Sequence, residues 1–292
     1  MGTRIRNAEV VKVVDGDTIN VRAGEREFKL RLTCVDTEES LNTSTKPVTE
    51  AGSLASQMAK QYFPVGELVD LEFDTNDPVE VCLLKHLDNY GRLLCYVHKD
   101  GENFNLKLVR EGWSPYFVKY GRARFYHDEF TRAEREAQAT GGAIWNPALG
   151  NRGDYDVLIA WWSQRALIVE DYRRTGLDTG VLSVRIDYQT IVNAAENDQT
   201  ITVLCDLQAP MQQWPGGGAL IYAGSPTHKF NLWIPEFETE AKQPIVRLLN
   251  TRYIGTNKRN YVYITGQASL YGGKPQIVLE SLDQISDFPP GM

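Results

Sequence analysis

The sequence has 292 residues, of which 42% are hydrophobic and 24% charged, and a formal net charge of −7. This composition predicts a soluble globular chain with two domains, and no apolar run approaches the roughly 18 to 20 residues of a membrane span. The negative net charge argues against a protein that coats nucleic acid nonspecifically, because affinity for a polyanion comes largely from Lys and Arg contacts. It leaves a local nucleic-acid site open.

Cysteine and histidine usage argues against a disulfide framework and against a zinc site. Cys34, Cys82, Cys95 and Cys205 are widely spaced within apolar runs, so we expect buried free thiols. The four histidines are equally scattered and form no zinc-binding pattern. The start of the chain, MGTRIRNAEV, lacks the apolar middle of a signal peptide, so we expect a cytoplasmic protein, or an exported one whose leader has been removed.

The N-terminal part of the chain predicts a strand meander followed by a helix. The first 22 residues read as two strands around a DGD turn, and AGE then leads into the strand KLRL, which contains Arg31. After the polar loop SLNTSTKPV, Leu54, Met58 and Tyr62 recur at helical spacing until Pro64 stops the helix.

The next segments complete the predicted barrel. ELVDLEF and VCLLKH are predicted as strands, and DNYGR as the hairpin turn that leads into the strand RLLCYVH. Helical stretches near 104–111 and 125–139 close the unit around Ile144 and Trp145. Five strands with a helix between the third and fourth are the arrangement of an OB-type barrel, so residues 1–146 are predicted to form one with helical additions.

A second domain is predicted beyond the loop NPALGNRGD. Residues 147–176 join this linker to a helix, YDVLIAWWSQRALIVEDYRR, that ends near Gly176. The remainder, 177–292, is rich in strand patterns, contains a helical segment at 239–254 and closes with a hairpin turned by YGGKP. The predicted fold class is therefore mainly β with α additions, with a second OB-like barrel joined to the first by a helical linker.

Carboxylates gather around the strand that carries Arg31. They lie in the two segments VVDGDT and VDTEE: Asp15, Asp17, Asp36, Glu38 and Glu39. Clustered like charges repel unless a cation lies among them, and oxygen ligands suit Ca²⁺ or Mg²⁺. The segment is not an EF-hand, because Arg26 stands where that loop needs Glu. Ordinary turn chemistry explains the same residues without a metal, and spacing alone leaves both readings open.

The order of the motifs is more informative than any one of them. VDGDTINV, RLTCVDTEES, the helix with EAGSLAS, DNYGRLLCYV, NLKLVREGW and AEREAQATGGAIW follow one another along residues 8–146. In this order and spacing they resemble the thermonuclease, or staphylococcal nuclease-like, family over roughly half of the chain. The resemblance implies an OB-type barrel and Ca²⁺-dependent cleavage of DNA and RNA, the substrate partners, to products with 3′-phosphates.

The resemblance also implies roles for individual residues. The implied Ca²⁺ site consists of Asp17, Asp36 and the carbonyl of Thr37, with Asp15 behind it. The implied catalytic residues are Arg31, Glu39 and Arg92. Because arginine keeps its proton at ordinary pH, both arginines are expected to stabilise charge on the phosphate rather than act as acids. Glu39 is expected to accept a proton from the attacking water or to orient it.

Two features depart from the family pattern. Glu38 stands where the family usually has proline, which bears on the rigidity of the loop that carries Glu39. The stretch WSPYFVKYGRARF matches the family's base-stacking region only in part. Tyr116 and Tyr120 are the candidate substrate-binding residues, with buried packing as the alternative for each.

The second half of the chain gives a weaker signal. Its last hairpin and KFNLWIP resemble OB-fold nucleic-acid-binding modules, which predicts contact with nucleic acid or with a protein partner. The candidate stacking aromatics, for which core packing is the alternative, are Tyr222, Phe230, Trp233, Tyr261 and Tyr263. An excess of three acidic residues over basic ones in 155–292 weakens the nucleic-acid interpretation.

Three function classes remain open from the sequence. An active nuclease is favoured, because every charged position implied by the resemblance is filled. The alternatives are a catalytically silent nucleic-acid-binding or scaffold module of the same fold, and a Ca²⁺-binding module that is not an enzyme. We expect a monomer without a membrane span, located in the cell envelope or secreted if a leader has been removed and in the cytoplasm otherwise.

Overall fold

The structure is a computed structural model that describes residues 1–42, 47–176, 178–207, 209–255 and 257–291. The chain divides into two compact units, Met1–Ala166 and Leu167–Met292. The division falls within helix α5 (Tyr155–Asp171), inside the segment predicted as linker and helix. None of the helices in the described part of the chain has the length and apolarity needed to span a membrane.

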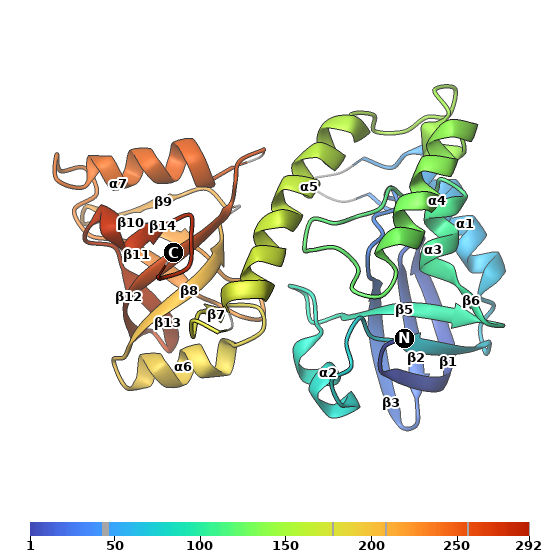
Figure 1. Ribbon diagram of the computed structural model, residues 1–292, viewed down its shortest axis with the longest axis horizontal. Helices are drawn as coiled ribbons and strands as arrows, with labels where there is room; N and C mark the ends of the chain where they lie inside the picture. The colour runs from blue at the N-terminus through green and yellow to red at the C-terminus, as the bar shows by residue number, and fades with distance from the viewer. Residues whose placement is uncertain (43–46, 177, 208, 256, 292) are drawn as a thin grey trace. The chain divides into compact units, whose positions relative to one another are not determined.

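Unit 1 contains the predicted barrel. Its strands are β1 (Arg4–Asp15), β2 (Thr18–Ala23), β3 (Arg26–Leu32), β4 (Leu68–Glu72), β5 (Leu93–Lys99) and β6 (Glu102–Asn103). They pair in the order β3-β2-β1-β4-β5-β6, and a parallel β3–β5 pairing closes the sheet (Figure 1). This closed mixed barrel of five strands confirms the OB-type fold predicted from the sequence.

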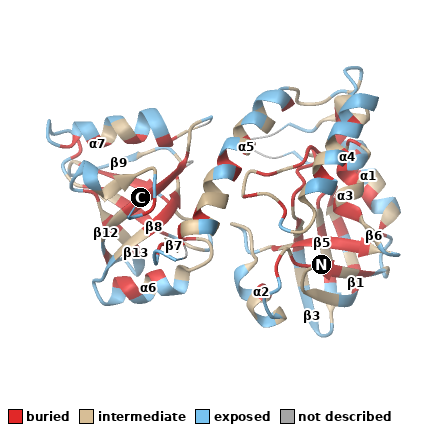
Figure 2. Cartoon of the chain, in the orientation of Figure 1, coloured by how far each residue is buried: buried red, intermediate tan, exposed pale blue. Residues whose placement is uncertain are grey.

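Apolar side chains from alternate strand positions fill the barrel. Figure 2 shows these buried positions along the strands. Because successive strand residues point to opposite faces, the same alternation leaves polar residues such as Lys29 and Arg31 on the other face of β3. All four cysteines are free and buried, as the sequence predicted.

Helices surround the barrel of unit 1. They are α1 (Glu50–Tyr62), α2 (Val79–Lys85), α3 (Phe104–Arg110), α4 (His127–Thr140) and the short 3-10 helix η1 (Ala143–Trp145). The buried face of α1 is made of small residues, including Ala51, Ala55 and Ala59, whereas Leu54 is exposed. The helix was predicted correctly, and of the three residues that mark its spacing, Met58 and Tyr62 pack against the core while Leu54 does not.

The prediction of a strand at VCLLKH is wrong, because this segment belongs to helix α2. Glu80 lies in the first turn of the helix and Lys85 in the last, and both charges favour a helix. The DNYGR turn that follows does reverse the chain, and Leu87 and Leu93 form a single antiparallel bridge across it. The turn therefore connects a helix, rather than a strand, to β5.

A buried ionic cluster ties the N-terminal strand to the barrel. Glu72, at the end of β4, is fully buried and accepts hydrogen bonds from the Arg4 guanidinium (2.8 Å), the Tyr126 hydroxyl (2.8 Å) and the Gly2 amide (2.6 Å). His98 Nε2 lies 2.7 Å from the same carboxylate. Burial opposes ionisation, but these donors, led by His98, outweigh it and lower the pKa of Glu72 to about 2.

Unit 2 is a second β-sheet domain. Its strands are β7 (Leu182–Ser183), β8 (Thr200–Asp206), β9 (Gln212–Trp214), β10 (Gly218–Tyr222), β11 (Asn231–Ile234), β12 (Tyr261–Tyr271), β13 (Lys274–Val278) and β14 (Ile285–Ser286). Its helical segments are η2 (Tyr172–Gly176), α6 (Tyr188–Glu196), α7 (Gln243–Leu248), η3 (Leu249–Tyr253) and η4 (Leu282–Gln284). Helix α6 was missed by the sequence analysis.

The sheet of unit 2 follows the order β7-β8-β12-β13-β11-β10-β9, with β11 parallel to β13. In unit 1 the corresponding parallel pairing, between β3 and β5, closes the barrel. A closed barrel in unit 2 would also need β8 to pair with β10, and no such pairing occurs among the described residues, so the OB-like barrel stays a prediction here. Of the candidate stacking aromatics, Phe230, Tyr261 and Tyr263 are buried and belong to the core, while Tyr222 is exposed.

Candidate active site

The first pair of carboxylates lies where β1 turns into β2. Asp15 ends β1 and Asp17 directly precedes β2, so both carboxylates lie at one end of the barrel. Gly16, between them, packs so closely on Thr37 that a Cβ atom would lie 2.8 Å from the Thr37 hydroxyl. A glycine is therefore needed for the turn to contact the loop that carries Asp36.

The loop after β3 brings the second set of charges to the same place. Arg31 pairs with Thr18 on β2 and with Leu94 on β5, which fixes its side chain beside the β1–β2 turn. The chain then turns sharply at Cys34, whose φ of 63° is unusual for a residue with a side chain. The hydroxyl of Ser114 accepts a hydrogen bond from the Asp36 amide (2.8 Å) and anchors the loop after this turn.

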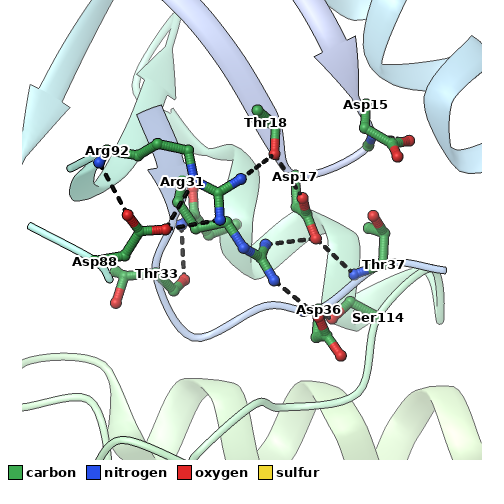
Figure 3. Close-up of polar contacts among 12 residues, drawn as sticks. Asp15, Asp17, Thr18, Arg31, Thr33, Asp36, Thr37, Asp88, Arg92 and Ser114 are labelled. Atoms are coloured by element: carbon green, nitrogen blue, oxygen red, sulfur yellow. Dashed lines mark hydrogen bonds and ion pairs between the residues drawn. The ribbon is translucent and has the colours of Figure 1, made fainter. Parts of the chain in front are cut away.

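Arg31 joins the two segments through ion pairs (Figure 3). One amino group of its guanidinium contacts Asp17, and the other donates to Asp36 Oδ1 at 2.8 Å. Asp17 also accepts a hydrogen bond from the amide of Thr37 at 3.0 Å. The structure therefore brings Arg31, Asp17, Asp36 and Thr37 together, with Asp15 at the edge of the group.

Burial and the neighbouring charges shift the pKa values of Asp17 and Arg31. Burial raises the pKa of Asp17; Arg31 opposes this shift, and the neighbouring Asp36 and Asp15 add to it. For Arg31, burial disfavours the charged form, but Asp17 and Asp36 outweigh it and raise its pKa. The guanidinium therefore stays charged, and it lies among carboxylates that it compensates only in part.

Arg92 approaches the same region from the turn before β5. Its Nε and one amino group each lie 2.7 Å from Asp88 Oδ2, and its other amino group donates to the Thr18 hydroxyl at 3.3 Å. Thr18 in turn donates to Asp17 Oδ1 at 3.0 Å. A continuous chain of polar contacts thus runs from Arg92 to Asp17 and on to Arg31 (Figure 3).

The two glutamates of the loop are placed differently. Glu38 is only 3% exposed, and its Oε1 accepts hydrogen bonds from the Arg152 amide (2.9 Å) and the Tyr155 hydroxyl. Glu39 is partly exposed, and its carbonyl accepts from the amide of Thr49 at 3.3 Å. The role predicted for the Glu39 carboxylate stays a prediction.

The two candidate substrate-binding tyrosines differ in burial. Tyr116 is 5% exposed, its ring stacks on Phe130 at 5.0 Å between centroids, and its hydroxyl accepts from the Ala123 amide. The prediction for Tyr116 is therefore corrected, because a ring held in the core offers no face to a base. Tyr120 is only partly buried and lies close enough to Arg31 to contribute to its raised pKa, so it remains a candidate.

The donor chemistry of the site fits a hard cation. Asp17, Asp36 and the Thr37 carbonyl offer only oxygen, and the buried Thr37 hydroxyl has no hydrogen-bond partner in the structure. In the part of the chain that is described, no three His, Cys, Asp or Glu side chains are grouped as a metal site on their own. A cation here would be held by two carboxylates and a backbone carbonyl, with water in the remaining positions.

Comparison with known proteins agrees with this geometry. Residues 29–147 match the family described as Staphylococcal nuclease homologue. The Thermonuclease of Staphylococcus hyicus is 34% identical over 139 residues, which cover 47% of this chain and 75% of that protein. The chain belongs to the staphylococcal nuclease homologue family.

Two further relatives support the family assignment. Endonuclease YncB of Bacillus subtilis (strain 168) is 32% identical over 154 residues, or 51% of this chain and 67% of that protein. The Thermonuclease of Staphylococcus intermedius is 34% identical over 142 residues, or 47% of this chain and 74% of that protein. The family match ends at residue 147, so it does not extend into unit 2.

Sequence reasoning missed several residues that position the charged groups of this family site. Asp88 orients Arg92 and lies four residues before it in DNYGR, a spacing that pattern analysis can recognise. Thr18 directly follows Asp17, so its contact with that carboxylate could also have been predicted from the sequence. Ser114, which accepts from the Asp36 amide, and Arg152, which contacts the Asp36 carboxylate, are distant from Asp36 in sequence, and no local pattern points to them.

Proposed function

We propose that the chain is a Ca²⁺-dependent nuclease that hydrolyses phosphodiester bonds of DNA and RNA to products with 3′-phosphates. The observation that carries the proposal is the convergence of Arg31 and Arg92 with Asp17 and Asp36 at one end of the barrel. These side chains come from three separate segments of the chain, and the family match supports a common purpose for them.

The arginines supply the main electrostatic contribution. A phosphodiester gains negative charge on its non-bridging oxygens as water attacks, so fixed guanidinium groups stabilise the transition state more than the substrate. Arg92 presents a planar fork that suits two phosphate oxygens, and Asp88 fixes its orientation. Arg31 is held more rigidly, because its amino groups contact two carboxylates.

The carboxylates of the site are assigned two roles: to bind the cation, and to orient or deprotonate the attacking water. Asp17, Asp36 and the carbonyl of Thr37 would bind Ca²⁺, with Asp15 behind them. When bound, the ion would supply positive charge beside the phosphoryl oxygens and the attacking water. Glu39 accepts a proton from the attacking water or orients it. The oxygen of that water bonds to phosphorus, the bond from phosphorus to the 5′ oxygen breaks, and a solvent water supplies the proton for the leaving 5′ oxygen.

The test is cleavage of single-stranded DNA, double-stranded DNA and RNA with Ca²⁺, with Mg²⁺ and with chelator. We expect cleavage that requires Ca²⁺, and 3′-phosphate ends on the products. Glu39→Gln should lose most of the rate, whereas Glu136→Gln, an exposed glutamate on α4, should retain it. If the protein binds Ca²⁺ but cleaves none of these substrates, the nuclease proposal is wrong and a silent binding module takes its place.

A further inference from the structure

A segment beyond the family match contacts the proposed metal-binding loop. The match ends at residue 147, and the chain then passes Gly150 to enter α5 at Tyr155. Within this stretch the amide of Arg152 donates to Glu38 Oε1 at 2.9 Å, and the hydroxyl of Tyr155 donates to the same oxygen. Both donors belong to unit 1, as does the loop that they contact.

These two hydrogen bonds determine the orientation of a buried carboxylate. Glu38 is almost completely enclosed, and its second oxygen, Oε2, has no hydrogen-bond partner in the structure. A buried carboxylate without donors is strongly disfavoured, so the position of Glu38 depends on Arg152 and Tyr155. Burial, together with the Glu38 carboxylate, raises the pKa of Tyr155, so its hydroxyl keeps the proton that it donates.

Arg152 also contacts the loop through its side chain. One amino group lies 3.4 Å from Asp36 Oδ2, on the opposite oxygen from the one that Arg31 contacts. The guanidinium lies over the ring of Tyr155 at 5.2 Å and that of Trp162 at 5.9 Å. One residue therefore restrains both Asp36 and Glu38.

The other side of the loop is packed against helix α1. Thr49 donates its amide to the Glu39 carbonyl, and a Cβ atom on Gly52 would lie 2.2 Å from that carbonyl. The amide of Ala51 donates to the carbonyl of Gly150 at 3.0 Å, which joins the helix to the downstream segment. The loop is thus enclosed between α1 and residues 150–155.

We propose that Arg152 and Tyr155 are positioning residues of the nuclease site, which act through Glu38 to fix the loop that carries Asp36 and the Thr37 carbonyl. This inference rests on the proposed function. It assigns a role in the active site to residues outside the family match. In this role the buried Glu38 connects the loop to residues 152 and 155 through the hydrogen bonds that it accepts. Neither residue needs to touch the substrate for this role.

The first test is Tyr155→Phe, which removes one hydrogen bond and no charge. Loss of a group that orients a metal-binding loop typically costs about 10- to 100-fold in metal affinity or activity, and we expect about 10-fold weaker Ca²⁺ binding by calorimetry. At saturating Ca²⁺, kcat should fall while KM for DNA stays unchanged. Tyr62→Phe is the matched control, because its hydroxyl donates to Glu102 at 2.8 Å in the same unit.

A second comparison separates the hydrogen bonds from the charge of Glu38. Glu38→Gln and Glu38→Ala remove the same charge, but only glutamine retains an oxygen that can accept from Tyr155. We expect Glu38→Ala to bind Ca²⁺ about 10-fold more weakly than Glu38→Gln. Tyr155→Phe should weaken binding in the wild-type background and add nothing in the Glu38→Ala background.

Amide hydrogen exchange without Ca²⁺ reports on the loop itself. Faster exchange of the amides of residues 36–40 in Tyr155→Phe, but not in Tyr62→Phe, is expected if the segment fixes the loop. A wild-type protein that neither binds Ca²⁺ nor cleaves nucleic acid would refute the proposed function. Equal Ca²⁺ affinity and equal exchange in wild type and Tyr155→Phe, with nuclease activity intact, would overturn this inference alone.

Discussion

Arg92→Ala is the substitution that most directly tests the proposed chemistry. The Arg92 side chain is 25% exposed, and Asp88 keeps two backbone amide donors at 2.9 Å after the guanidinium is removed. The loss of folding free energy should therefore be small, about 1 kcal/mol, as for other partly exposed ion pairs. Loss of a preorganised charge donor should instead lower kcat by about 10²- to 10³-fold, or about 2.7–4 kcal/mol.

The assay is the initial rate of single-stranded DNA cleavage at saturating Ca²⁺, with the folded fraction measured by circular dichroism in the same buffer. Arg110→Ala is the matched control, because Arg110 also pairs with a carboxylate, Glu102 at 2.6 Å, and is more exposed. Arg92→Lys keeps the charge without the fork and should give an intermediate rate. If Arg92→Ala cleaves at the wild-type rate, Arg92 is only part of a salt bridge at the start of a strand.

Three further predictions follow from the ionic contacts. Arg31→Ala should lower the free energy of unfolding in urea by about 3–5 kcal/mol, because buried Asp17 loses its ion pair and Asp36 keeps only the longer contact with Arg152. A loss below about 1 kcal/mol would contradict this. Ca²⁺ at 100 times its Kd should stabilise the wild type by about 2.7 kcal/mol in a thermal-shift titration, and Asp36→Asn should lose most of that gain. The lowered pKa of Glu72 implies stability that is full above its ordinary value of 4.5 and is lost as pH falls towards about 2, so Glu72→Gln should flatten this dependence in acid unfolding experiments.

The fold of unit 1 was largely accessible from the sequence because its strands alternate apolar and polar residues. Strands β1 to β3 each bury one face, so a period of two is visible even in short segments. The error at α2 has the opposite origin. Seven residues give too little helical periodicity to distinguish VEVCLLK from a buried strand, and the helix-favouring charges at Glu80 and Lys85 are weak signals.

The charged groups of the site were accessible for a different reason. Asp15, Asp17 and Arg31 lie at or near the ends of strands that pair with one another, and Asp36 follows shortly after β3. Contacts that depend on packing between distant segments were not accessible. The burial of Tyr116 depends on Phe130 in α4, so its position in the core follows from tertiary structure that no local pattern contains.

The balance of charges predicts that the arginines alone are insufficient to bind an anionic substrate. The site and the loop that carries Asp36 together contain six carboxylates and three guanidinium groups: Asp15, Asp17, Asp36, Glu38, Glu39, Asp88, Arg31, Arg92 and Arg152. With every group ionised, this set carries three negative charges in excess, and a phosphodiester adds another. A divalent cation reduces this excess negative charge by two. The resulting gain in electrostatic energy is substantial, because charges interact more strongly in a partly buried site than in bulk water. The proposed dependence on Ca²⁺ should therefore appear in substrate binding as well as in the cleavage rate, so that chelator raises the Kd for a DNA strand that cannot be cleaved.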